Sequence, residues 1–171
     1  MEFNILAALV AGFVATIVMT LMMKASTAAG MTDMPPMPLV SGTMFSGDRD
    51  TAKRIGAFVH FIAMGTVVLG IAYAALFSAF GTASWLAGLV IGLVHGAMVG
   101  LVGMPMMGSV HPRMTATAEP RGRTVVESAG EVAVVAPGVF GKNWGGITPA
   151  GMLMGHAIYG LILALVYSAI A

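Results

Sequence analysis

The sequence contains no cysteine and few charged residues, and each absence excludes a class of protein. Without cysteine the chain has no disulfides, no thiolate metal sites and no cysteine-held iron–sulfur clusters. Charged residues make up only 9% of the chain. Soluble domains carry roughly 25%, so this chain has too little polar surface to coat a water-exposed domain. The net charge of +1 and the lack of a basic patch exclude nucleic acid as an expected partner.

Hydrophobic residues make up 58% of the chain and gather in four long stretches. Each stretch is long enough to cross ~30 Å of hydrocarbon as a helix. The four cover residues of about 5–23, 55–80, 85–107 and 149–171, and they leave two long loops at about 24–54 and 108–148. With 171 residues there is no room for a separate soluble domain. We therefore expect one all-α membrane domain (residues 1–171), a bundle of four transmembrane helices.

The ends of these stretches carry local signals. Expected helix N-caps are Ser84 before Trp85, Asp50 or Thr51 before the second stretch, and Thr148 before Pro149. Pro105 is expected to end the third helix, because proline has no N–H to donate and clashes with the preceding turn.

Positive charge is confined to the two long loops. All eight Lys and Arg residues lie between Lys24 and Arg54 or between Arg113 and Lys142. Loops rich in Lys and Arg stay on the cytoplasmic side. The sequence therefore predicts cytoplasmic long loops and both termini outside, for a multi-pass protein of a bacterial inner (cytoplasmic) membrane.

Three blocks of sequence recur in the same order. Ala8–Thr16 resembles Gly88–Gly96, Val40–Phe45 resembles Val135–Phe140, and His60–Tyr73 resembles His156–Tyr167. We interpret this as two parallel helical-hairpin repeats, related by a pseudo-twofold axis along the membrane normal. Chance similarity between Ala-, Gly- and Val-rich helices is the alternative. The second copy carries an insertion whose Val125–Val135 stretch is expected to form an interfacial helix or a docking arm.

Small residues are spaced as in helices that pack closely in lipid. The third helix has a glycine at every fourth position, and the first and fourth helices carry similar ridges. The expected helix-packing residues are Gly12, Thr16, Gly88, Gly92, Gly96, Gly100, Gly151 and Gly155. This glycine-zipper pattern predicts close contact within the chain or with another subunit. A groove for a flat cofactor or a lipid tail is the alternative.

Three histidines lie inside the expected spans. The repeat gives His60 and His156 matching positions near the cytoplasmic end, and His95 falls near the midplane. Two imidazoles at one depth on different helices could ligate haem b or a metal such as copper. The alternatives are rings bonded to backbone carbonyls or hydroxyls, and a proton relay. We expect the carbonyl or hydroxyl bonds, because the spans offer no carboxylate to orient the rings.

The chain has 16 methionines, several of them near the expected cytoplasmic face. Met31, Met34 and Met37 recur every third residue around Pro35 and Pro36, a spacing that aligns side chains in polyproline II. A second cluster comprises Met104, Met106, Met107, His111 and Met114. Thioethers suit Cu(I), but cytoplasmic copper is usually held by thiolates, which this chain lacks. Methionine also fills irregular gaps in cores.

No catalytic constellation is present, so we do not expect an enzyme. Short motifs nevertheless match a known pattern: Gly12-Phe-Val-Ala-Thr16-x2-Met19, His60-x4-Gly65-x7-Tyr73, His95-Gly96 and His156-x3-Gly160-x6-Tyr167. The pattern resembles an uncharacterised family of small bacterial four-helix integral membrane proteins. This resemblance implies fold and membrane location, and it assigns no chemistry.

Two functions remain open. The first is a non-catalytic accessory or structural subunit, without cofactor, of a larger respiratory or photosynthetic membrane complex, with lipid and other membrane subunits as partners. The second is a small haem- or metal-binding membrane carrier or transporter that uses His60 and His156.

The predicted topology can be tested with alkaline phosphatase fusions, which are active only outside the cytoplasm. A fusion at Ala171 should be active and one near Glu119 inactive, because positive charge keeps the loops inside. The reverse pattern would invert the orientation.

Overall fold

The computed structural model describes residues 1–115 and 123–171, so the fusion site near Glu119 lies outside the described residues. Within the described part, four helical segments are long and apolar enough to cross a membrane, as the sequence predicts. They are Ile5–Ala28, Arg49–Phe80, Trp85–Val110 and Thr148–Ile170. The first three run further into the loops than expected.

The second and third spans are each built from three consecutive helical pieces. The helices are α1 (Ile5–Ala28), α2 (Met37–Thr43), α3 (Arg49–Ala57), the π-helix η1 (Phe58–Leu69), α4 (Gly70–Phe80), α5 (Trp85–Met98), the π-helix η2 (Val99–Gly103), α6 (Met104–Val110), the 3-10 helix η3 (Val139–Trp144) and α7 (Thr148–Ile170). Thus α3, η1 and α4 form one continuous span, and α5, η2 and α6 form another.

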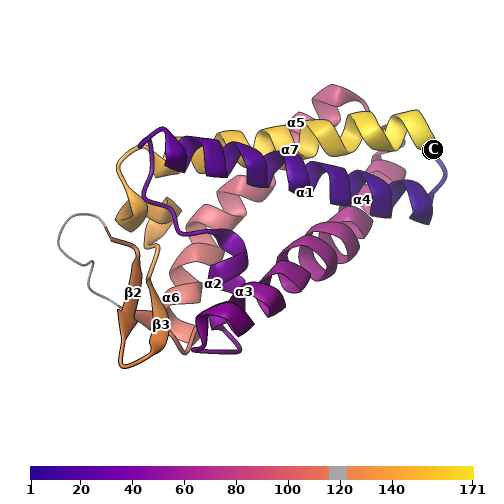
Figure 1. Cartoon of the computed structure of the whole chain (residues 1–171). Coiled ribbons are helices and arrows are strands. Elements are labelled where there is room, and N and C mark those ends of the chain that lie inside the picture. Colours follow the sequence, from indigo (N-terminus) through magenta and orange to yellow (C-terminus); the bar gives the residue numbers. More distant parts are fainter. Residues whose placement is uncertain (116–122) are drawn as a thin grey trace.

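The two chain ends and the Gly81–Ser84 turn lie at one end of the molecule. The Tyr167 hydroxyl accepts the Asn4 N–H at 2.9 Å. Next to it, the Ser168 hydroxyl donates to the Ala83 carbonyl at 2.7 Å. Figure 1 shows α1 and α7 side by side, with the C-terminus at one end and α2, α6 and the strands towards the other. The described parts of both long loops therefore lie at the end opposite the termini.

Helices α5 and α7 approach each other until their backbones touch. A Cβ added to Gly92 would overlap the carbonyl oxygen of His156 and lie 3.0 Å from the Cα of Ala157. Gly88 and Gly160 face each other with the same overlap. Lipid gives apolar helices no hydrophobic reason to associate, so van der Waals contact at such small residues holds them together.

Helix α1 meets the second span through a similar contact. A Cβ on Gly12 would lie 2.7 Å from the carbonyl oxygen of Gly65 and 2.8 Å from the Cα of Gly70. The side chain of Thr16 covers Gly65 directly. A glycine is therefore required on both sides of this crossing.

These contacts relate the two hairpins differently from the sequence alignment. Gly70 packs on Ala8 and Gly12, and Gly160 packs on Gly88 and Gly92. The carbonyl of Gly65 then faces Gly12 as the carbonyl of His156 faces Gly92. By this packing, the residue that corresponds to His156 in the first hairpin is Gly65, and His60 lies further towards the loops.

The glycines of α7 near the loop end do not pack against another backbone of the described chain, so for them only the expected contact with another subunit stays a prediction. A Cβ on Gly151 would meet nothing within 4 Å, and one on Gly155 would meet only the Met19 side chain, at 3.7 Å. On α5, Gly96 lies against the His156 side chain. Gly100, in η2, lies against the ring of Phe140. Close contact between α5 and α7 is therefore limited to the half nearer the termini.

The chain is not all-α, because Val125–Val135 forms a β-hairpin rather than the expected helix or arm. Strands β2 (Val125–Ser128) and β3 (Glu131–Val135) pair antiparallel, and β1 (Met114–Thr115) adds in parallel to β3. Ala129 and Gly130 have φ of 53° and 81°, as a tight hairpin turn requires. The three valines of β3 are β-branched, which favours a strand, and Val132 and Val134 share one face of it.

One recurring block of sequence has two different structures. Val40–Phe45 lies mainly in α2, whereas Val135–Phe140 runs from the end of β3 into η3. These two segments therefore share a sequence pattern without sharing a local fold.

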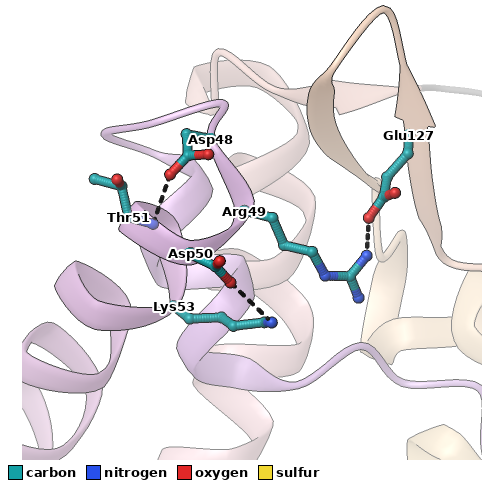
Figure 2. A network of polar contacts seen from close by, with 6 residues as sticks. All are labelled: Asp48, Arg49, Asp50, Thr51, Lys53 and Glu127. Atoms are coloured by element: carbon teal, nitrogen blue, oxygen red, sulfur yellow. Dashed lines mark hydrogen bonds and ion pairs between the residues drawn. The ribbon is translucent and has the colours of Figure 1, made fainter.

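The N-cap of α3 lies two or three residues before the expected position. The Asp48 carboxylate accepts the N–H of Thr51 at 2.8 Å, so Asp48 is the N-cap instead of Asp50 or Thr51 (Figure 2). The pKa of the Asp48 carboxyl is lowered mainly by a hydrogen bond from the side chain of Thr51, and next by the one from its backbone N–H. From the first turn of α3, Arg49 forms an ion pair with Glu127 of β2. The hairpin is thereby attached to the second span.

Two further helix ends differ from expectation and one agrees. Ser84 caps α5 as predicted, accepting the N–H of Ala87 at 3.2 Å. Thr148 lies inside α7, and its hydroxyl donates to the Trp144 carbonyl at 2.8 Å. Pro105 does not end the third span, which continues to Val110 because the wide turn of η2 directly before it accommodates the missing N–H.

Gly92→Ala should destabilise the protein by about 1–3 kcal/mol, because the added methyl would force the α5 and α7 backbones apart. The matched control is Gly151→Ala, which adds the same atoms to a helix at a position with free space. It should be neutral or stabilising by up to about 1 kcal/mol. Thermal unfolding in detergent measures both, and equal effects would contradict the packing argument.

Candidate functional site: a cavity lined by methionine and histidine

A cavity of about 470 Å³ lies between α1, η1, α5, α7 and the two loops. Its wall follows α1 from Thr16 to Ser26, which is about 15 Å at ~1.5 Å per residue. Ligand pockets usually measure roughly 300–1,000 Å³, so the volume suits a bound ion or small molecule. The cavity lies on the loop side of the glycine crossings.

Most of the chain's 16 methionines line this cavity. They are Met19, Met22 and Met23 of α1, Met31, Met34 and Met37 at the first loop, Met64 of η1, Met104 and Met107 of α6, and Met152 and Met154 of α7. The described lining residues include no Asp, Glu, Lys or Arg. Polarisable thioethers and neutral groups therefore dominate the wall.

The three histidines of the spans line the same cavity from three different helices. The rings of His95 (α5) and His156 (α7) are in edge-to-face contact, with centroids 4.8 Å apart and planes at 89°. His60 (η1) instead has its ring against Phe61. The structure thus brings His156 together with His95, whereas the sequence pairs it with His60.

Hydrogen bonding fixes the tautomer of His156. Its Nδ1 lies 2.8 Å from the carbonyl oxygen of Met152. A carbonyl only accepts, so Nδ1 carries the proton and Nε2 keeps a free lone pair. This bond confirms the expectation that a backbone carbonyl orients the ring.

The tautomer of His60 follows from the threonines of α1. The Thr20 hydroxyl gives its single proton to the Thr16 carbonyl at 2.7 Å. Its contact with Nε2 of His60, at 2.9 Å, must therefore be accepted from the imidazole. His60 carries its proton on Nε2, the opposite tautomer to His156.

Aromatic side chains hold the third histidine. Nδ1 of His95 lies 3.0 Å from the Tyr73 hydroxyl, and the Tyr73 ring contacts that of Tyr159 at a centroid distance of 5.4 Å. The Tyr159 hydroxyl donates in turn to the Gly65 carbonyl at 3.0 Å. Helices α4, α5 and α7 therefore position His95 and His156 together.

The π-helix η1 borders the cavity with His60, Met64 and Gly65. A π-turn leaves backbone carbonyls without their ordinary helical partners, and side chains bond them here. The Thr66 hydroxyl donates to the Phe61 carbonyl at 2.7 Å. The sequence gives no signal for this segment.

His111 has a structural role. Its Nε2 donates to the Val40 carbonyl at 3.0 Å, and its Nδ1 accepts the N–H of Arg113 at 3.1 Å. Both ring nitrogens are therefore used. Of the expected second methionine cluster, only Met104 and Met107 reach the cavity among the described residues.

The geometry limits what the cavity can bind. In the described part of the chain, no three His, Asp or Glu side chains converge as a metal site. A metal here would need thioethers in addition to imidazoles. Haem held between His95 and His156 does not fit, because their rings already touch edge to face.

Proton-detected ¹⁵N NMR of the protein in detergent should find the opposite neutral tautomers: Nδ1–H for His156 and Nε2–H for His60. The reason is that a carbonyl accepts from the first ring and the Thr20 hydroxyl from the second. Thr20→Val should release His60 from its single tautomer and leave His156 unchanged. The same tautomer at both positions would contradict the assignment.

Comparison with known proteins places the chain in a family but gives no activity. No curated protein and no solved structure is detectably similar to it. A family match covers residues 3–119, from α1 through α6, and ends before α7, which carries His156. The expected likeness to an uncharacterised family is confirmed to this extent. The chain belongs to the family of unknown function DUF6789.

Proposed function

We propose that this protein is a non-catalytic membrane carrier that binds a metal ion in the cavity lined by methionine and histidine. The observation that carries the proposal is the free Nε2 lone pair of His156 in a cavity walled by thioethers. We place the protein in a bacterial cytoplasmic membrane with both termini outside. The position of both basic loops opposite the termini supports that orientation.

The accessibility of this nitrogen follows from hydrogen-bond accounting. Every fully buried side-chain nitrogen and oxygen in the described residues has a hydrogen-bond partner. Nδ1 of His156 bonds the Met152 carbonyl, and the described residues provide no bond to Nε2. Since His156 is only 8% exposed and lines the cavity, Nε2 meets the cavity space. We therefore assign this nitrogen as a metal ligand, because a neutral imidazole nitrogen is the commonest metal ligand in proteins.

The bonds around the imidazoles also support a metal site. Metal-binding histidines almost always donate their second ring nitrogen to a carboxylate, a carbonyl or a water. In His156 the second ring nitrogen, Nδ1, donates to the Met152 carbonyl. In His95, Nδ1 lies within hydrogen-bond distance of the Tyr73 hydroxyl, which can accept from it. These bonds fix the ring orientations without any acid in the span.

An accessory or structural subunit of a larger complex has less support. That hypothesis uses the small-residue ridges as surfaces for other subunits. Gly12, Gly88 and Gly92 already pack against helices of the same chain, so these ridges are not free to bind a partner.

The test is to purify the full-length protein in gentle detergent from its native membrane and measure transition metals by elemental analysis. Wild type should retain metal. Gly151→Leu adds a side chain that lines the cavity without meeting a backbone, and it should lose most of that metal. The matched control Gly146→Leu makes the same change at an open position outside the cavity lining and should retain metal like wild type.

Two results would contradict the proposal. One is wild-type protein without transition metal that instead carries a lipid or another organic molecule displaced by Gly151→Leu. The other is metal retained equally by both variants, which would place it outside the cavity. Co-purification of a large membrane complex with metal-free protein would favour the accessory subunit.

A further inference from the structure

We infer that the metal is Cu(I), held by Nε2 of His156 together with the thioethers of Met152 and Met19, with His95 as the adjacent imidazole. The inference rests on the proposed function and names its ligand. It is carried by the donor set, by the absence of charge in the described cavity wall and by the contacts that bring these four side chains to one region.

The donor atoms favour a soft ion. Thioether sulfur and imidazole nitrogen are neutral donors, and thioethers select Cu(I) over harder divalent ions. Zn²⁺ sites in proteins are built from thiolate, imidazole and carboxylate. Among the described lining residues only imidazole is present of these three. Protein sites for Mg²⁺ and Ca²⁺ are built around carboxylate oxygens, and the described lining residues supply hydroxyls but no carboxylate.

Charge points to the same ion. Neutral ligands leave the full charge of the ion uncompensated inside the span. The desolvation penalty of an ion rises with the square of its charge, so a monovalent ion is much less unfavourable there than a divalent one. The described lining residues supply no carboxylate to neutralise a second charge.

The contacts place the ligands together. Met152 and His156 are four residues apart on α7, so their side chains lie on the same face of the helix. The methyl group of Met19 lies beside Gly155, the neighbour of His156. On the other side, the His95 ring touches that of His156. A Cβ added to Gly155 would make ordinary contact with this methyl group, at 3.7 Å, so the Met19 side chain reaches the face of α7 beside His156.

Thioethers also line the cavity at its loop end, where an ion would enter. Met31 is exposed, Met34 is buried, and both line the cavity. The segment is anchored by Thr32, whose hydroxyl donates to the Trp144 carbonyl at 3.1 Å. Cu(I) can pass from one thioether to the next by exchange of neutral ligands. Each step breaks one copper–sulfur coordination bond and forms another. No electron is transferred, so the ion enters and leaves as Cu(I).

The experiment measures Cu(I) binding by the full-length protein in detergent, without oxygen, by competition with a coloured Cu(I) chelator. Wild type should bind one Cu(I) with high affinity. X-ray absorption at the copper edge should show both nitrogen and sulfur neighbours. A copper shell without sulfur would overturn the inference.

Two variants remove one donor each while conserving shape. Met152→Leu replaces the thioether with a hydrocarbon of similar volume. His156→Asn keeps an N–H to donate to the Met152 carbonyl and removes Nε2. Each should weaken Cu(I) binding at least tenfold, and His156→Asn should also lower the nitrogen count at copper. The control Met98→Leu makes the same methionine change on the exposed face of α5 and should bind like wild type. Thermal unfolding identifies any variant that fails to fold.

The outcomes separate this inference from the proposed function. If native protein retains another transition metal that Gly151→Leu removes, the carrier proposal holds and Cu(I) is wrong. If wild type takes up no Cu(I), or if both ligand variants fold and bind as tightly as Met98→Leu, the assigned site is also wrong. Native protein that contains no metal contradicts both.

Discussion

The glycine crossings bring helix backbones to a separation at which no side chain fits between them. They occur at Gly88 and Gly92 against α7, and at Gly12 against the second span. All lie in the half of the molecule nearer the termini. Towards the loops the second and third spans lie away from α1 and α7, as Figure 1 shows for α3 and α6. Methionines, the first loop and the start of α7 surround the resulting space. The cavity is thus a consequence of close packing between the spans at the end nearer the termini. At the loop end the close glycine contacts, at Gly42 and Gly56, join α2 to α3 instead.

Polar groups inside the spans are arranged so that hydrogen bonds are satisfied without charge. The Thr16 and Thr20 hydroxyls bond carbonyls of their own helix, and Thr20 also holds His60. Unpaired polar atoms are costly in lipid, which explains why these bonds stay within or between neighbouring helices. One ring nitrogen of each span histidine departs from this pattern and has no hydrogen-bond partner among the described residues. We assign the ligand to Nε2 of His156 because His156 is buried, whereas His60 and His95 are partly exposed. The metal site proposed for the cavity therefore rests on the same requirement that stabilises the spans, namely that each buried polar atom has a partner.

Hydrophobicity alone predicts the four spans. The Ser84 cap is also predictable, because a serine hydroxyl before a helix accepts a free backbone N–H of its first turn. The Val125–Val135 hairpin was missed because a short apolar run reads equally well as a helix, although its alternating valines and the Gly130 turn are visible in the sequence. The pairing of His156 with His95 was missed for a different reason. It depends on which turn of α5 crosses which turn of α7. In the second span, the wider turns of η1 change the position of His60 along and around the helix. Sequence similarity around His60 and His156 records local pattern and carries no information on that crossing.

The Gly92 crossing also has a mechanical consequence. From Gly92 the continuous helix of α5, η2 and α6 runs to Val110, which is about 27 Å at ~1.5 Å per residue. A rotation of about 5° around the crossing would therefore move the far end of this helix by about 2 Å, roughly the radius of a methyl group. Two glycines in contact resist such rotation weakly, because no side chain interlocks across them. A small rotation at this crossing would therefore produce a larger change in the width of the cavity at the loop end.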